Sequence, residues 1–296
     1  MARTYERKIV FVVSDTHGGG ELGLLSPETK ITRQIVDGKD TVMVKCLVSL
    51  NESQKILWGH YEEDVAEVQK LAGTDEVIAI HNGDLSQGNK YLDDLAYASI
   101  ENQIAIACAN MKPILRLKTI KKFRLIWGTD SHIFQHASTP QLVERILGLQ
   151  FPSKDVRSLP HGLFNVSNFW IDGAHHGPTV GGRNWLKGNE MRYYMRDRLR
   201  TAFQSGHQMA NAILRAHYHT SHEEYMVESY AGIGRHKCVF VLGPSYTFMN
   251  EHARKVTRSN PISTVGSYAL EIVNGKLLDL HWFKRSYDIR IKEKLA

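Results

Sequence analysis

Short apolar runs alternate with longer amphipathic stretches along the 296-residue chain. The run Ile9–Val13 is rich in Val and leads into a glycine turn, which is the pattern of a strand covered on both faces of a sheet. Comparable runs at Val77–Ile80, Phe123–Trp127 and Ala212–Arg215 predict further buried strands. Strands that alternate with helical segments in this way are typical of an α/β fold.

The stretches between these runs repeat apolar residues at helical spacing. Asn51, with Gln54 three positions later, has the form of a capping box and predicts the start of a helix that ends at Gly73. Pro113 is expected to end or kink the next helix. The further helices are predicted over residues 91–117, 141–149 and 189–203.

Two hairpins complete the pattern. Residues 31–48 alternate around a polar turn and predict a surface hairpin, and residues 268–283 predict a terminal hairpin that turns at Asn274 and Gly275. One or two strands are expected over residues 163–171.

The composition is ordinary for a globular protein, with 42% hydrophobic and 23% charged residues and no repeat or linker. We therefore expect residues 1–296 to form a single domain.

The sequence also bears on location and redox chemistry. No apolar run approaches the roughly 20 residues that span a bilayer, and residues 1–8 lead into the first strand without a secretory signal. We therefore expect a cytoplasmic protein with no membrane partner, while the oligomeric state is left open. Cys46, Cys108 and Cys238 form no CxxC pair, which argues against a disulfide framework and against a thiolate zinc site.

The polar residues that follow the predicted strands are of types that bind metal ions. Asp15 and His17 come directly after the first strand, and on an extended chain a spacing of two directs both side chains to one face. Because ligands gather at the carboxyl ends of parallel strands, we expect these side chains to converge on a cation. The alternative is a turn-forming Asp beside a solvated His. The same residue types follow later strands as Asp84, Asp130, His132, His176, His217 and His219.

Taken in order, the strand ends give Asp-x-His, Gly-Asp, Gly-Thr-Asp-Ser-His, His-His-Gly and His-x-His. That series resembles the calcineurin-like metallophosphoesterases, whose motifs run in the same order. The resemblance implies a four-layer α/β/β/α sandwich and a dinuclear metal site that hydrolyses phosphoesters through a metal-bridging hydroxide. It also implies a role for each ligand: the first metal is held by Asp15, His17 and His219, both metals are bridged by Asp84, and the second is held by His176 and His217.

Metal-dependent phosphoester hydrolysis requires ligands of these types, independently of the family resemblance. Two divalent cations about 3.5 to 4 Å apart can share a carboxylate, activate a bridging water and neutralise charge on phosphoryl oxygens. A shell of carboxylate and imidazole without thiolate suits Mn, Fe, Zn or Co. The expected cofactors are therefore two divalent metal ions, with Mn the first candidate and Mg also compatible, and the expected partner is a phosphoester substrate.

Two departures from the family pattern bear on function. Gln87 stands where the family's Gly-Asp-x-x-Asp motif has its second Asp, so the chain does not resemble the protein Ser/Thr phosphatase branch. In place of Gly-Asn-His, the chain offers Thr129 or Asp130 as the oxygen ligand; Asp130 is favoured because a carboxylate binds such cations better than a hydroxyl does. His132 would then contact phosphate and protonate the leaving oxygen, and the alternative is a solvated or helix-capping His.

His175 is interpreted differently from its neighbour. It directly precedes His176 on a segment that is expected to be extended, where adjacent side chains point in opposite directions. We therefore expect His176 to be the ligand, and His175 either to be packed or to contact the metal ligands without binding the metal itself.

The charge pattern leaves three functions open. The formal net charge of +6 and the pI of about 9.1 permit attraction to polyanions. Basic and aromatic residues interleave over residues 181–200, where Arg183 and Arg192 are the expected substrate-binding residues, and this favours a phosphodiesterase that acts on nucleic acid, a nuclease. The plainer alternative is a solvated basic helix whose Tyr and Met residues face the core. The other functions are a small-molecule phosphomonoesterase or cyclic-nucleotide-type esterase, and a catalytically inactive, metal-stabilised scaffold.

Overall fold

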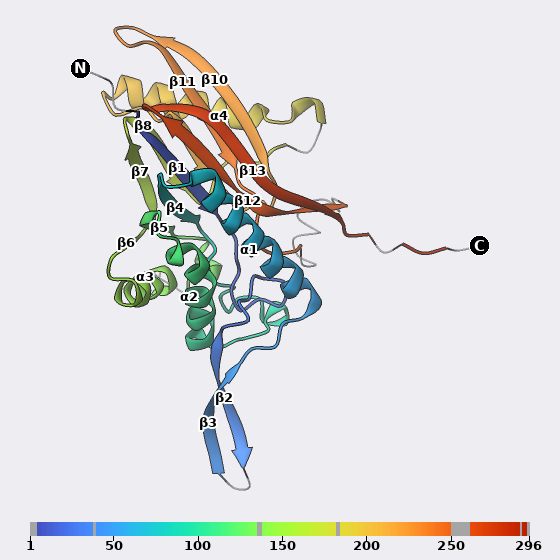
Figure 1. The fold of residues 1–296 in the computed structure, drawn as a ribbon. Coiled ribbons are helices and arrows are strands. Elements are labelled where there is room, and N and C mark those ends of the chain that lie inside the picture. Colours follow the sequence, from blue (N-terminus) through green and yellow to red (C-terminus); the bar gives the residue numbers. More distant parts are fainter. Residues whose placement is uncertain are drawn as a thin grey trace.

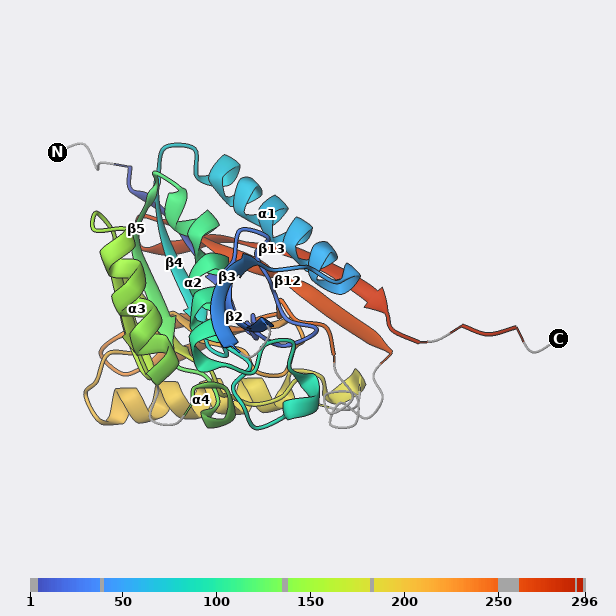
Figure 2. The same cartoon turned by 90° about the horizontal axis from the view of Figure 1, so that it is seen from below.

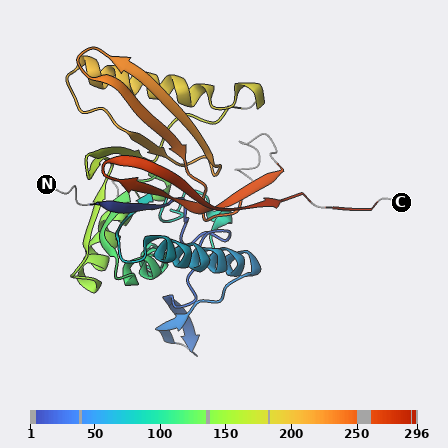
Figure 3. The same ribbon diagram turned by 45° about the horizontal axis from the view of Figure 1, so that its top comes forward.

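The computed structural model describes residues 5–37, 40–134, 138–181, 184–249, 261–290 and 292–294. Within these ranges two large β-sheets stack face to face, and helices cover both outer faces (Figure 1, Figure 3). Apolar residues from both sheets form the core between them, including Val12, Leu214 and Val241. This is the four-layer α/β/β/α sandwich that was expected.

The first sheet has the strand order β13-β12-β1-β4-β5-β6. In this sheet β1, β4, β5 and β6 pair in parallel, while β12 is antiparallel to β1 and to β13. The carboxyl ends of β1, β4 and β5 therefore lie side by side at one edge. The strands are β1 (Arg7–Val13), β4 (Glu76–Asn82), β5 (Ile120–Ile126), β6 (Asp155–Leu159), β12 (Ile262–Val273) and β13 (Lys276–Asp288).

The second sheet has the strand order β10-β11-β9-β8-β7. Since β8 and β9 pair in parallel, the chain leaves both strands at the same edge. The strands are β7 (His161–Val166), β8 (Phe169–Ala174), β9 (Ala212–Arg215), β10 (His222–Tyr230) and β11 (Gly234–Leu242). A third, two-stranded sheet, β2 (Lys30–Asp37) and β3 (Asp40–Leu47), projects from the body as a hairpin (Figure 1).

In the part of the chain that the structure describes, three α-helices cover the first sheet and one covers the second. They are α1 (Glu52–Ala72), α2 (Ile100–Arg116) and α3 (Ser138–Gln150) on one side, and α4 (Asn189–Gln204) on the other. Figure 2 shows α2 between α1 and α3. Alternate residues of β1 serve two cores, because Phe11 packs against the helices and Val10 faces the other sheet. Among the described helices, none is long and apolar enough to cross a membrane.

The first helix begins and ends as its sequence predicts. The Asn51 side chain accepts a 2.8 Å hydrogen bond from the Gln54 backbone, and the Gln54 side chain accepts a 3.1 Å bond from the Asn51 backbone. This reciprocal capping box satisfies two N–H groups that have no partner within the helix. At the other end, Gly73 adopts a φ of 59°, which glycine tolerates best.

The prediction of a helix over residues 91–117 is wrong for residues 91–99. Residues 91–99 contain only one 3₁₀ turn, because two of their backbone N–H groups donate to the Gly19 carbonyl oxygen at 3.0 Å. The α-helix begins after Ser99, whose hydroxyl caps it at Asn102 N. Pro113 lies inside α2 and does not end it.

Candidate metal centre

The loops after β1, β4, β5, β8 and β9 bring carboxylate and imidazole groups together. Their ligand atoms form four overlapping groups of three, and within each group all three atoms lie within 4.8 Å of one another. Seven residues that the sequence singled out take part, and His175 joins them. The groups are Asp15, His17 and His219; His17, Asp84 and His132; Asp15, Asp84 and His175; and His175, His176 and His217.

Five of these residues have left-handed backbones. Their φ values are 50° for Asp15, 44° for His17, 51° for Asp84, 77° for His217 and 48° for His219. Non-glycine residues rarely adopt such angles, and they keep them only where the surroundings hold the chain. Here the loops after β1 and β4 hold each other, since Asp15 N donates to the Gly83 carbonyl and His17 N to the Asp84 carbonyl, both at 3.0 Å.

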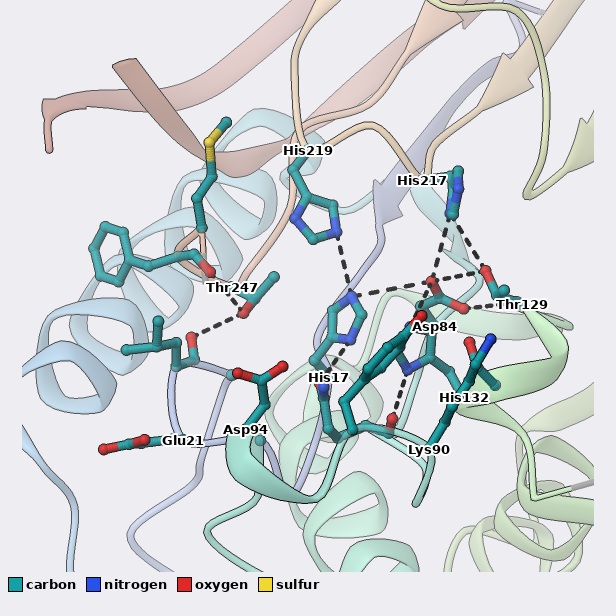
Figure 4. A pocket seen from close by; sticks show the side chains of 18 of the residues that line it. His17, Glu21, Asp84, Lys90, Asp94, Thr129, His132, His217, His219 and Thr247 are labelled. Carbon is teal, nitrogen blue, oxygen red and sulfur yellow. Dashed lines mark hydrogen bonds and ion pairs between the residues drawn. The ribbon is translucent and has the colours of Figure 1, made fainter. Parts of the chain in front are cut away.

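Asp15, His17 and His219 form the first group (Figure 4 labels the two histidines). Nε2 of His219 lies 3.3 Å from Oδ1 of Asp15 and 3.3 Å from Nε2 of His17. Nδ1 of His17 donates to the side-chain oxygen of Gln87 at 2.9 Å, which leaves Nε2 facing the group. Burial, with the nearby His132, lowers the pKa of His17 to about 3, so the ring is neutral and can offer a lone pair.

Asp84 lies between the first group and the group formed by His175, His176 and His217. Burial raises the pKa of its carboxyl, but the adjacent histidines, His175 foremost, outweigh this and hold it well below the usual value. Thr129 fixes both oxygens: its backbone N–H donates to Oδ1 at 2.6 Å and its hydroxyl to Oδ2 at 3.2 Å. The same hydroxyl lies 3.3 Å from Nδ1 of His217 and 3.4 Å from Nε2 of His176.

Asp130 does not lie at the oxygen-ligand position that its sequence context predicts. It is exposed, it opens the 3₁₀ turn Asp130–His132, and it belongs to none of the four groups. The oxygen that the structure brings to this position is the hydroxyl of Thr129. The physical reason is the hydrogen bond from Thr129 N to the Asp84 carboxylate. This bond holds Thr129 against the site, and Asp130 therefore turns outward.

His175 is buried, and its ring faces into the cluster. Strand β8 ends at Ala174, so alternation no longer governs the next residue. Nδ1 of His175 donates to the Asn82 carbonyl at 2.7 Å, which aims Nε2 at Asp84 Oδ2, 2.9 Å away, and Asp15 Oδ1, 3.9 Å away. Burial lowers the pKa of His175, but the charges of Asp84 and then Asp15 outweigh it and raise the pKa to about 9. The site thus favours positive charge at this point.

Two buried atoms are suited to a metal ion. Within the described ranges, Oδ1 of Asp15 and Nε2 of His175 form no hydrogen bond of regular geometry, and their nearest polar neighbours are other members of the cluster, His219 Nε2 at 3.3 Å and Asp84 Oδ2 at 2.9 Å. A buried polar atom left in this way is costly unless an ion or water satisfies it. The donors are carboxylate oxygens and imidazole nitrogens, which bind first-row divalent cations. The residues present therefore fit a metal centre.

His132 lies on the open side of the cluster. Its Nδ1 donates to the Gln87 carbonyl at 2.5 Å, so Nε2 faces Asp84 Oδ2 at 4.0 Å. The His132 and His17 rings meet edge to face with centroids 4.6 Å apart. His132 lines a cavity of about 360 Å³ that extends from the cluster to Lys90 and Phe248 (Figure 4).

Of the two arginines expected at the substrate, only Arg192 is described by the structure, and it is not brought to this cavity. Arg183 lies outside the described residues. Arg192 lies on α4, forms a 2.6 Å ion pair with Glu224 of β10, and does not line the cavity. Arg196 is likewise paired with Glu228, while Met191 of the same helix is buried in the core. Two arginines of α4 are thus paired with glutamates and its Met residues face the core, as the alternative of a solvated basic helix expects, whereas Tyr193 is exposed.

No family model and no curated protein matches the chain. Among solved structures it is similar to Haemophilus influenzae NAD nucleotidase (NadN), with 10% identity, a TM-score of 0.36, and 94% of this chain and 49% of that chain covered. It is also similar to Thermus thermophilus sulfate thiohydrolase SoxB, with 10% identity, a TM-score of 0.38, and 97% and 58% covered. The chain thus spans about half the length of both.

Proposed function

We propose that the chain is a metal-dependent phosphoesterase that binds two divalent cations in the cluster of carboxylates and imidazoles after β1, β4, β5, β8 and β9. The observation that carries the proposal is the position of Asp84, whose carboxylate belongs to one group with His17 and His132 and to another with Asp15 and His175. A shared carboxylate is what a dinuclear phosphoesterase site requires. The proposal agrees with the resemblance of the ligand series to the calcineurin-like metallophosphoesterases.

The residues suggest how the cations would be held. The first would be bound by Asp15, His17, His219 and Asp84, and the second by Asp84, His175, His176 and His217, with the Thr129 hydroxyl beside it. When bound, such cations activate water and neutralise charge on phosphoryl oxygens. Mn is the first candidate, and the donor set also accepts Fe, Zn, Co or Mg.

The chain's own side chains would then orient and protonate the substrate. Nδ1 of His132 is committed to the Gln87 carbonyl, so Nε2 is the atom that can donate a proton to the departing oxygen. The non-phosphoryl part of the substrate would occupy the 360 Å³ cavity, against Tyr91, Tyr218 and Phe248. A cavity of this size suits a small phosphoester. Because the arginines of α4 are paired with glutamates, we favour such a substrate over nucleic acid.

Hydrolysis assays after metal removal test the proposal. Bis-p-nitrophenyl phosphate and p-nitrophenyl phosphate are offered to the metal-free protein with Mn added back, and Mn content is measured in parallel. Mn-dependent turnover that disappears in Asp84→Asn supports the phosphoesterase. If Mn binds and neither ester is cleaved, the chain is the inactive scaffold instead. Salt titration of substrate binding addresses nucleic acid, since several backbone contacts give a steep salt dependence and one phosphate gives a shallow one.

A further inference from the structure

Tyr246 connects the candidate metal centre to the far side of the first sheet. Its backbone N–H donates to the carbonyl oxygens of Ser14 and Asp15, at 3.3 and 3.2 Å. Its side chain is completely buried, and its hydroxyl donates to the carboxylate of Asp64 on α1. The residue therefore joins the left-handed backbone of Asp15 to a helix that supplies no ligand to the cluster.

Asp64 is a buried carboxylate with three donors. Besides the Tyr246 hydroxyl, it accepts a 2.8 Å hydrogen bond from Ser267 on β12, and it is paired with Arg285 on β13. A buried carboxylate is unfavourable unless its oxygens accept hydrogen bonds, so the three donors must stay close to Asp64. These bonds therefore fix the positions of α1, β12, β13 and Tyr246 relative to one another. Asp64 is not among the residues that line the cavity.

The residues after Tyr246 form one wall of the cavity. The hydroxyl of Thr247, which Figure 4 labels, donates to the Leu22 carbonyl at 2.9 Å. The Phe248 backbone N–H donates to the same carbonyl at 3.1 Å. Thr247, Phe248 and Met249 all line the cavity. The segment Tyr246–Met249 thus hydrogen-bonds to the backbone of Asp15, a candidate ligand, and also forms part of the cavity wall.

We propose that Asp64 and Tyr246 are positioning residues for the metal centre, an inference that rests on the proposed function. Their hydrogen bond keeps the Tyr246 backbone against Asp15 and so holds Asp15 in the conformation that aims its carboxylate at His219. A left-handed non-glycine residue keeps its conformation only where its neighbours determine it. The same bond fixes the wall from Thr247 to Met249.

Tyr246→Phe is the principal test, because it removes one hydroxyl and leaves the ring in place. Tyr61→Phe is the matched control: Tyr61 is equally buried and packs edge-on against Tyr246 at 5.1 Å, but its hydroxyl has no hydrogen-bond partner in the described part of the chain. Mn affinity is measured by calorimetry, KM and kcat with bis-p-nitrophenyl phosphate, and folding by circular dichroism. Asp64→Asn alters the acceptor of this bond, and the milder Ser267→Ala removes a second donor to Asp64.

For Tyr246→Phe we expect Mn affinity about 10-fold weaker, as for loss of other groups that orient metal ligands. KM should rise severalfold and stay raised at saturating Mn, where kcat recovers, and Tyr61→Phe should match the wild type in all three. If Tyr246→Phe and Ser267→Ala melt earlier but keep wild-type Mn affinity and KM, the network is merely structural and the inference fails alone. If wild-type protein binds no Mn, the proposed function fails and takes the inference with it.

Discussion

Thr129 holds the carboxylate of Asp84 from two directions, through its backbone N–H at 2.6 Å and its hydroxyl at 3.2 Å. A carboxylate fixed at both oxygens can face two partners without rotating. The hydroxyl also lies within 3.4 Å of the His176 and His217 rings, so it occupies the position where a further oxygen ligand would complete the group of His175, His176 and His217.

Thr129→Val should therefore weaken binding of the second metal. Val has nearly the shape of Thr but no hydroxyl, while the backbone bond to Asp84 remains. We expect Mn affinity at one of two sites to fall about 10- to 100-fold, as measured by calorimetry. Asp130→Asn is the control, because Asp130 is exposed and outside the cluster. Loss of metal in Asp130→Asn, with none in Thr129→Val, would restore the ligand that the sequence analysis favoured.

Gly128→Ala should damage the site by sterics. A Cβ at Gly128 would overlap a carboxylate oxygen and the backbone nitrogen of Asp84, so Asp84 would have to move. We expect turnover to fall at least about 10-fold, since small displacements of reacting groups cost rates of this order or more. Gly59→Ala is the control: it lies in α1 with open space around its Cβ, and it should raise the free energy of unfolding by about 0.4 to 1 kcal/mol. Wild-type turnover in Gly128→Ala would contradict the close approach.

Metal binding should release a proton from His175. Its pKa is raised to about 9, so at pH 7 the metal-free protein carries this proton on Nε2, and a metal ion must displace it. Mn affinity should rise with pH and level off above about 9, because the raised pKa keeps the proton in place below that value. Calorimetry in two buffers with different ionisation enthalpies counts the protons. His175→Gln should release about one fewer, and an unchanged count would place the proton elsewhere.

Local rules account for the parts of the fold that the sequence predicted well. The capping box at Asn51 and the glycine at Gly73 set the ends of α1, because both act within one turn of the helix. The buried strands followed from their apolar runs, and parallel pairing then brought Asp15 and Asp84 to one edge. Residues 91–99 could not be predicted in this way, since their partner, Gly19, lies far away in sequence.

Orientation accounts for the parts of the site that the sequence missed. Chemical preference favoured Asp130, but one backbone bond to Asp84 turns Thr129 inward instead. Strand alternation favoured His176 over His175 as the ligand, yet the strand ends at Ala174, one residue before His175. Arg192 looked available for phosphate because its partner, Glu224, belongs to a strand whose place beside α4 no local pattern reveals.

His132 is the residue whose proposed role differs most from that of its neighbours, because it would act on the leaving group and need not hold metal. Its Nδ1 is tied to the Gln87 carbonyl, and its Nε2 faces the cluster. Replacing it with Ala should leave Mn content nearly unchanged and lower kcat by roughly 10² to 10⁴, the range for a lost general acid. His207→Ala, at an exposed position on the turn after α4, is the control.

The leaving group distinguishes a proton donor from a residue that only binds phosphate. A p-nitrophenolate leaves readily without a proton, whereas an alkoxide does not, so the deficit of His132→Ala should be smaller for p-nitrophenyl esters than for alkyl esters. Equal deficits for both would assign His132 to phosphate binding. If His132→Ala loses Mn while Thr129→Val keeps it, His132 is itself a ligand, which its place in one group with His17 and Asp84 allows.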